Sequence, residues 1–252
     1  YSKVEVPVLE LIRPDGTIVP VDVAANSKVM TEPGQMQSNI YDPNQRILQV
    51  SIPELRIGDI IHVVSRETTL KLRIRGVWTN FITFQSSTPI HYYEYVVNAP
   101  AELPLRSKVV KDEVKGTVTF GEEKKDGRII YTWTARNVPQ IFPEPAMPPM
   151  YMVAQRLLVS TAGNWPEISR WYWELSAPHL DKTTPEMKAK VAELIAGKKT
   201  ELDKINAIFQ FVSREVRYAG LTLEADAPGY EPHDVDITFE KRNGVCRDKA
   251  AL

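Results

Sequence analysis

The hydrophobic periodicity of this 252-residue chain changes once, on either side of a proline-rich stretch, and this change restricts the possible folds. Before residue 138, short segments alternate apolar and polar residues, as strands with one buried face do. After residue 160, apolar residues recur three and four positions apart, as on the buried face of a helix. Between them, "VPQIFPEPAMPP" holds five prolines in twelve residues, which excludes both a helix and a central strand. We therefore expect an α+β fold, with strands first and helices afterwards.

Residues 1–150 are expected to form an antiparallel β-sandwich-like domain. Pro14-Asp15-Gly16 and Asp126-Gly127 supply residues that tolerate the positive φ of tight turns, so we expect a hairpin at each. The segments with strand-like alternation are Val4–Leu11, Thr17–Val23, Arg46–Ile52, Asp59–Ile74, Phe81–Phe84, Tyr92–Val97, Val114–Phe120 and Arg128–Thr134. A further extended segment is expected over Met152–Val159.

Residues 151–252 are expected to form a second, mainly helical domain. A first helix follows Asn164, a good capping residue, and has Pro166 in its first turn. A second helix is predicted over Thr183–Gly197, and a third starts at Thr200, which resembles the start of a capping box. The apolar stripe of the first helix consists of Ile168, Trp171, Tyr172 and Leu175.

The composition excludes several classes of partner. Lys plus Arg number 31 against 32 Asp plus Glu, so the formal net charge is -1 and no nucleic-acid partner is expected. The apolar runs are far shorter than the roughly 20 residues that cross a bilayer, so we expect no membrane-spanning segment. Glycines form no phosphate-binding loop, and no cofactor is expected. No metal site is expected either, because one cysteine accompanies four scattered histidines, His62, His91, His179 and His233.

The single cysteine, Cys246, lies in "RNGVCRDKAAL", between a turn sequence and a run of helix-forming residues. Asn243-Gly244 favours a sharp turn, and "CRDKAAL" favours a helix with Asp248 in its first turn. At the start of a helix, peptide dipoles favour the nucleophilic thiolate, and backbone N–H groups can stabilise the oxyanion of an acyl intermediate. The carboxylate of Asp248 acts in the other direction, because a nearby negative charge opposes thiolate formation. Cys246 is therefore a candidate catalytic nucleophile.

Other interpretations of this region stay open. From placement alone, a buried and unreactive Cys246 is the commoner case, because free cysteines are among the most buried residues. His233 is a candidate general base, although a histidine in a polar loop is commonly just solvated. Asp234 and Asp236 beside it are expected in loops and turns. Tyr218 is a candidate oxyanion donor or, alternatively, a tyrosine that caps the core.

Three segments together carry a resemblance to a known family. "NGVCRDKAAL" resembles the nucleophile motif of bacterial transglutaminase-like proteins, and "KINAIFQFVSREVRY" is similar to the helix that precedes that motif. The β half followed by "LVSTAGNWPEISRWYWEL" is similar to the uncharacterised β domain that commonly precedes transglutaminase-like domains in bacteria. The resemblance spans nearly the whole chain.

The resemblance implies that residues 151–252 are the helical front part of a papain-like domain with a Cys-His-Asp triad, in which Cys246 is the nucleophile. In that family the histidine and aspartate follow the cysteine. We therefore expect them beyond Leu252 and expect residues 1–252 alone to be inactive, with His233 as a second hypothesis for the base. The implied activity is that of a cysteine peptidase, amidase or acyltransferase. It acts on a protein or peptide substrate through a thioester, with hydrolysis favoured over cross-linking, in the periplasm or at the cell surface.

An alternative from another class also stays open: a non-catalytic binding or scaffold protein whose β domain binds a protein or glycan partner. The aromatic residues of the β half can line a groove for such a partner, although strands also favour aromatic residues for ordinary packing. These residues are Trp78, Phe81, Phe84, Tyr92, Tyr93 and Tyr95. No sequence pattern indicates an oligomeric state.

Overall fold

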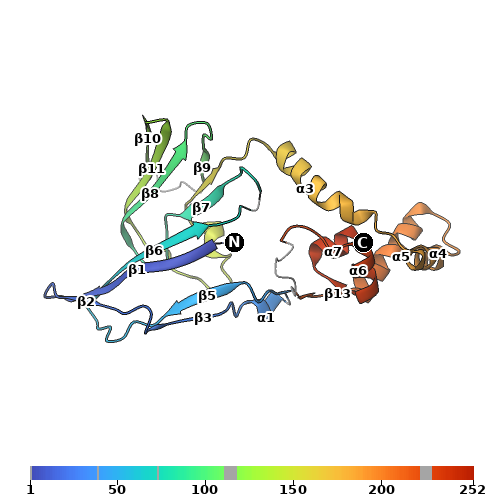
Figure 1. Ribbon diagram of the computed structural model, residues 1–252, viewed down its shortest axis with the longest axis horizontal. Helices are drawn as coiled ribbons and strands as arrows, with labels where there is room; N and C mark the ends of the chain where they lie inside the picture. The colour runs from blue at the N-terminus through green and yellow to red at the C-terminus, as the bar shows by residue number, and fades with distance from the viewer. Residues whose placement is uncertain (1, 39, 73, 111–117, 222–228) are drawn as a thin grey trace. The chain divides into compact units, whose positions relative to one another are not determined.

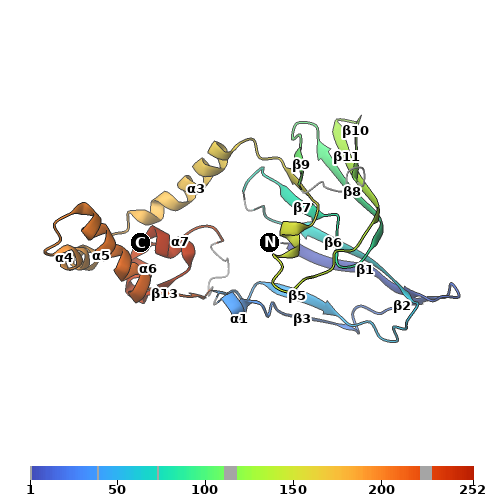
Figure 2. The same cartoon turned by 180° about the vertical axis from the view of Figure 1, so that it is seen from behind.

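The computed structural model describes residues 2–38, 40–72, 74–110, 118–221 and 229–252, and Figures 1 and 2 show it from opposite sides. It is an α+β protein, as expected, with antiparallel sheets in the N-terminal part of the chain and helices in the C-terminal part. Its contacts define two compact units, one made of Tyr1–Lys71 with Ser169–Leu252 and the other of Leu72–Ile168. The domain boundary expected between residues 150 and 151 stays a prediction.

The unit made of Leu72–Ile168 contains two antiparallel sheets that share one core (Figure 1). One sheet has the strand order β10-β11-β8 and the other has the order β7-β12-β9. Every second side chain of β11 from Ile129 to Ala135 is buried, as the alternation in the sequence predicts. Trp133 and Phe84 are the largest fully buried side chains in this core. The strands are β7 (Thr79–Thr83), β8 (Ile90–Pro100), β9 (Arg106–Val110), β10 (Val118–Lys125), β11 (Arg128–Val138) and β12 (Arg156–Ser160).

The hairpin expected at Asp126-Gly127 joins β10 to β11. Both turn residues have positive φ, 50° for Asp126 and 72° for Gly127, as a type I′ turn requires. Lys125 pairs with Arg128 directly across the turn, so the turn sets the register of the whole hairpin.

The β part of the other unit contains a three-stranded sheet with the order β2-β1-β6 and a separate hairpin of β3 and β5. The expected turn at Pro14-Asp15-Gly16 joins β1 to β2, and Gly16 has a φ of 85°. The carboxylate of Asp15 accepts the N–H of Thr17 at 2.9 Å, which closes the turn. The elements are β1 (Ser2–Ile12), β2 (Ile18–Pro20), β3 (Ser27–Thr31), α1 (Gln35–Ser38), β4 (Ile40–Tyr41), β5 (Arg46–Val50) and β6 (Ile60–Thr69).

Helices make up most of the chain after residue 164. The predicted capping residues begin the first three of them: Asn164 accepts the N–H of Glu167, Thr184 that of Met187, and Thr200 that of Asp203. Gly197 ends the second helix region with a φ of 74°. No helix of the described residues is long and apolar enough to cross a membrane. The remaining elements are α2 (Met150–Val153), α3 (Trp165–Leu180), α4 (Pro185–Ile195), α5 (Glu201–Glu215), β13 (Arg217–Tyr218), β14 (Gly220–Leu221), α6 (Val235–Lys241), β15 (Asn243–Gly244) and α7 (Cys246–Ala251).

Some expected elements differ from the structure. The strand predicted over Asp59–Ile74 ends at Thr69, because the following leucines are exposed and Gly76, with a φ of 74°, allows a tight turn. The extended segment predicted over Met152–Val159 begins instead with the end of α2 and becomes a strand only at Arg156. The strand predicted over Val114–Phe120 lies partly outside the described residues. The short strands β3 and β9 were not predicted.

Two glycines of the β10–β11 hairpin, Gly127 and Gly121, allow a test in which the two sites differ in backbone conformation. A Cβ added at Gly127 or at Gly121 meets no atom within 4 Å, but only Gly127 has a positive φ. We expect Gly127→Ala to lower the free energy of unfolding by about 1 kcal/mol, because an L residue is strained there. Gly121→Ala, inside β10, serves as the control and should leave the free energy unchanged or raise it slightly. Urea denaturation followed by tryptophan fluorescence measures both, and equal effects would contradict the turn assignment.

Candidate active site around Cys246

Cys246 is exposed and is the first residue of α7, as predicted. The alternative of a cysteine packed in the core is therefore wrong. The preceding strand β15 pairs in parallel with β13, which follows α5, so Gly244 lies opposite Tyr218. This short pairing joins the end of the predicted third helix to the cysteine motif, two segments that lie close to each other only after folding.

The phenol of Tyr218 lies beside the side chain of Cys246. Interaction with the Cys246 side chain raises the pKa of Tyr218 above its usual value, so the phenol stays protonated at neutral pH and can act as a donor. Tyr218 is 43% exposed, so it does not cap a core as the alternative interpretation had it. The phenol and the thiol are thus neighbouring, accessible groups.

Position 244 requires a glycine because the backbone there packs closely against two side chains and leaves no room for a Cβ atom. A Cβ at this position lies 2.7 Å from Cβ of Asp248 and 3.2 Å from Cγ2 of Thr238. Asp248 and Thr238 are each only 2% exposed, so neither can move aside without disturbing the packing beneath Cys246. The glycine of the motif therefore lets α7 approach α6 closely.

Asp248 is a buried carboxylate whose two oxygens are both occupied. Oδ2 accepts the N–H of Val245 at 2.9 Å, and Oδ1 accepts the N–H of His233 at 2.9 Å. Nδ1 of His233 lies 3.2 Å from the same Oδ1, and Nε of Arg247 lies 3.8 Å from it. Asp248 thus fixes the residue before Cys246 and also the segment that contains His233.

Arg247 and Lys249, the two basic residues of the motif, each bind a different neighbouring segment. Nε of Arg247 donates to the carbonyl oxygen of Glu231 at 2.7 Å. Nζ of Lys249 donates to the carbonyl oxygen of Val216 at 2.6 Å, just past the end of α5, where free carbonyl groups favour a cation. The charged side chains that follow Cys246 therefore hold the surrounding segments together.

We call residues 230–234 the strap, because this segment is attached to both α3 and α7. On α3, Nδ1 of His179 lies 2.6 Å from Oδ1 of Asp234, and Nε2 lies 2.9 Å from Oε1 of Glu231. Burial opposes protonation of His179, but the hydrogen bonds to these two carboxylates outweigh burial and raise the pKa of the imidazole. The rings of Trp171 and Tyr230 add an edge-to-face contact with centroids 5.9 Å apart.

Sequence reasoning missed the strap and also the helix that follows it. Asp234 and Asp236 were expected in loops and turns, but Asp234 is the N-cap of α6 and Asp236 lies in its first turn. The N-terminal acidic residues were a usable signal for this helix. The pairing of His179 with the strap had no local signal, because the partners are more than 50 positions apart.

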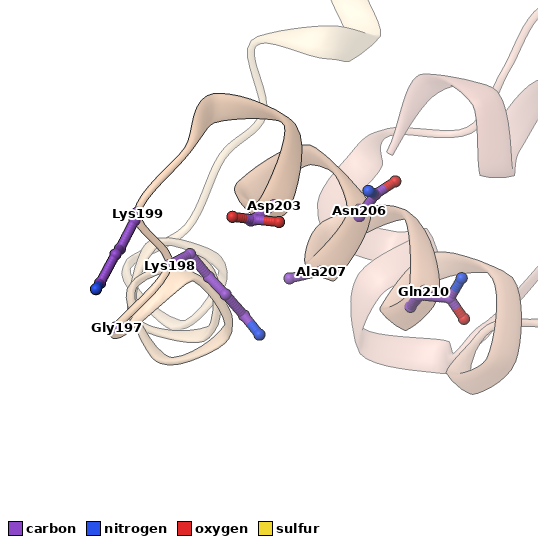
Figure 3. A pocket seen from close by; sticks show the side chains of 7 residues that line it. All are labelled: Gly197, Lys198, Lys199, Asp203, Asn206, Ala207 and Gln210. Carbon is purple, nitrogen blue, oxygen red and sulfur yellow. The ribbon is translucent and has the colours of Figure 1, made fainter.

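A shallow hollow of about 450 Å³ lies elsewhere, at the turn between α4 and α5 (Figure 3). Its side chains come from that turn and from one face of α5, and they do not include Cys246. The lining residues are Gly197, Lys198, Lys199, Asp203, Asn206, Ala207 and Gln210. Among the described residues, no group of three or more His, Cys, Asp or Glu residues is arranged to hold a metal ion.

Comparison with known families agrees with this arrangement. The family DUF3857, a domain of unknown function with a solved structure, matches residues 1–142, which is more than half of the chain. The chain belongs to this family. The transglutaminase-like superfamily matches residues 188–252, a range that contains α5, the strap and Cys246. Both matches confirm the resemblance found in the sequence.

A crystal structure gives the same fold. It is that of a protein from Parabacteroides distasonis ATCC 8503, described only provisionally as a protease, and it aligns with a TM-score of 0.74 and 19% identity. The alignment covers 100% of this chain and 47% of that protein, so the chain spans about half of the relative's length. At this identity the likeness concerns the fold alone. No curated protein matches the chain.

The close packing at Gly244 gives a prediction for the DUF3857 protein. We expect Gly244→Ala to lower the free energy of unfolding by about 2 kcal/mol, because the added methyl group overlaps Asp248 and Thr238. The neighbouring substitution Asn243→Ala removes one exposed hydrogen bond and serves as the control, with an expected change within about 0.5 kcal/mol. Thermal unfolding measures both variants, and a Gly244→Ala variant as stable as Asn243→Ala would contradict the packing described here.

Proposed function

We propose that Cys246 is the nucleophile of a transglutaminase-like cysteine enzyme that acts on amide or peptide bonds of a protein or peptide substrate. The observation that carries the proposal is the exposed thiol at the first residue of α7, beside the phenol of Tyr218, within the range that matches the superfamily. An exposed sulfur next to a protonated phenol is suited to attack on a carbonyl, because the phenol can donate to the oxygen that becomes negative.

The proposed reaction has two steps. The sulfur of Cys246 attacks the carbonyl carbon, the thiol proton passes through a base to the leaving nitrogen, and the C–N bond breaks to leave a thioester. Water then attacks the thioester carbon, which releases the carboxylic acid and restores the thiol. Hydrolysis is proposed over transfer to an amine, as the resemblance to bacterial transglutaminase-like proteins implies. In both steps Tyr218 is proposed to donate to the oxyanion.

The first hypothesis for the base follows the family order, in which a histidine and an aspartate come after the cysteine in the sequence. A second hypothesis uses His233. Its Nδ1 lies 3.2 Å from the buried carboxylate of Asp248, and a histidine held by a carboxylate through Nδ1 is oriented as in a catalytic triad.

Substitution at Cys246 and Tyr218 tests the proposed roles in the full-length protein. We expect Cys246→Ala to lower kcat/KM for hydrolysis of an amide substrate by at least about 10³-fold, since the covalent intermediate cannot form. Tyr218→Phe should lower kcat about 10- to 100-fold with a smaller change in KM, because the hydroxyl acts mainly in the transition state. Tyr172→Phe is the control, since Tyr172 on α3 is exposed to a similar degree, at 41%. Full activity of Cys246→Ala would contradict the proposal and favour the alternative of a binding or scaffold protein.

The two hypotheses for the base differ in what residues 1–252 can do alone. If the base follows Leu252, this chain should show no amide turnover above that of its Cys246→Ala variant. Release of amine from a peptide amide, monitored over hours, measures this. Turnover by residues 1–252 that is lost in His233→Gln would assign the base to His233. Added hydroxylamine, which converts a thioester to a hydroxamate, detects the intermediate in either case.

A further inference from the structure

The strap connects α3 to the helix that begins with Cys246 through a continuous series of contacts. His179 holds its two carboxylates, Glu231 and Asp234. The peptide N–H of His233, between those carboxylates in the sequence, donates to Asp248, whose other oxygen holds the N–H of Val245. Val245 is bonded directly to Cys246, so three hydrogen-bonded steps lie between the imidazole of His179 and the backbone of the cysteine.

His179 is a group in this series whose charge can change near neutral pH. In the protonated state both ring nitrogens are donors, so one imidazolium can bind Glu231 and Asp234 together. A neutral imidazole has one N–H, so one of the two contacts must weaken. The charged groups of the strap that contact the imidazole are the carboxylates of Glu231 and Asp234. Arg247 on α7 contacts the strap itself, at the carbonyl oxygen of Glu231.

We infer that His179 is a positioning residue for Cys246: its imidazolium clamps Glu231 and Asp234, and the strap then holds Asp248 against the start of α7. A role of His179 in catalysis depends on the proposed function of Cys246. The clamp itself is a property of the folded chain and can be measured without turnover.

The pH range of the clamp follows from the direction of the shift. The hydrogen bonds to the carboxylates raise the pKa of His179 above its usual value of about 6.5. A group whose pKa is raised on folding stabilises the structure fully below its unfolded pKa, and this contribution is lost as the pH rises through the folded pKa. The clamp is therefore closed at pH 5.5 and opens as the pH rises through the raised pKa of His179.

The experiment compares alkylation of Cys246 by iodoacetamide in the wild-type chain and in His179→Gln, at pH 5.5 and at pH 8.5. The ratio of the two rates at one pH removes the pH dependence that is common to both proteins. We expect the variant to react about threefold to fivefold faster at pH 5.5, because the released strap no longer restrains the start of α7. At pH 8.5 the ratio should be closer to one, since the wild-type clamp opens as the pH rises.

His62→Gln is the matched control. His62 on β6 also contacts a carboxylate, with Nδ1 2.8 Å from Oε1 of Glu10, but it lies outside the strap and its contacts. Its substitution should leave the alkylation ratio at one at both pH values. A His179→Gln ratio that is the same at pH 5.5 and pH 8.5 would overturn the inference, because a role in packing alone does not depend on the charge of the ring.

Glu231→Gln keeps the test decisive if His179→Gln fails to fold. It retains the imidazole and Asp234, the N-cap of α6, but removes one of the two charges that hold the proton. We expect an NMR titration of His179 to show a lower pKa in this variant than in the wild type, together with faster alkylation at pH 5.5. The same pKa of His179 in the variant and in the wild type would contradict the proposed clamp. None of these measurements requires amidase activity, so the clamp and the proposed function can fail independently.

Discussion

The buried carboxylate of Asp248 is the interaction on which the arrangement around Cys246 depends. Only 2% of this residue is exposed, and a polar group so far from water is tolerated only when hydrogen-bond partners surround it. Two of these partners are backbone N–H groups, one from Val245 and one from His233. The hydrogen bonds of one buried side chain therefore fix two separate segments of the chain at once.

The motif around the cysteine has an exposed side and a buried side. Cys246 is open to solvent, whereas Arg247, Asp248 and Lys249 direct their polar groups to the backbone of neighbouring segments. Gly244 allows this because a side chain there would collide with Asp248. A short helix with few apolar contacts can then hold its first residue in a defined place.

The parts of the fold that the sequence predicts well are those determined by neighbouring residues. The caps at Asn164, Thr184 and Thr200 and the turn at Gly127 depend on contacts within a few positions, so the local sequence contains the information. The strap is different, because α4 and α5 separate His179 from Glu231 and Asp234 along the chain.

The structure also changes the electrostatic argument about the nucleophile. From the sequence, a carboxylate two residues after the cysteine opposes a negative sulfur. In a helix, however, residues i and i+2 point to different faces, and here Cys246 lies on the exposed face and Asp248 on the buried one. The side-chain oxygens of Asp248 accept backbone N–H groups and lie near the side chains of His233 and Arg247. The same carboxylate can thus hold the site together without standing between the sulfur and an approaching carbonyl.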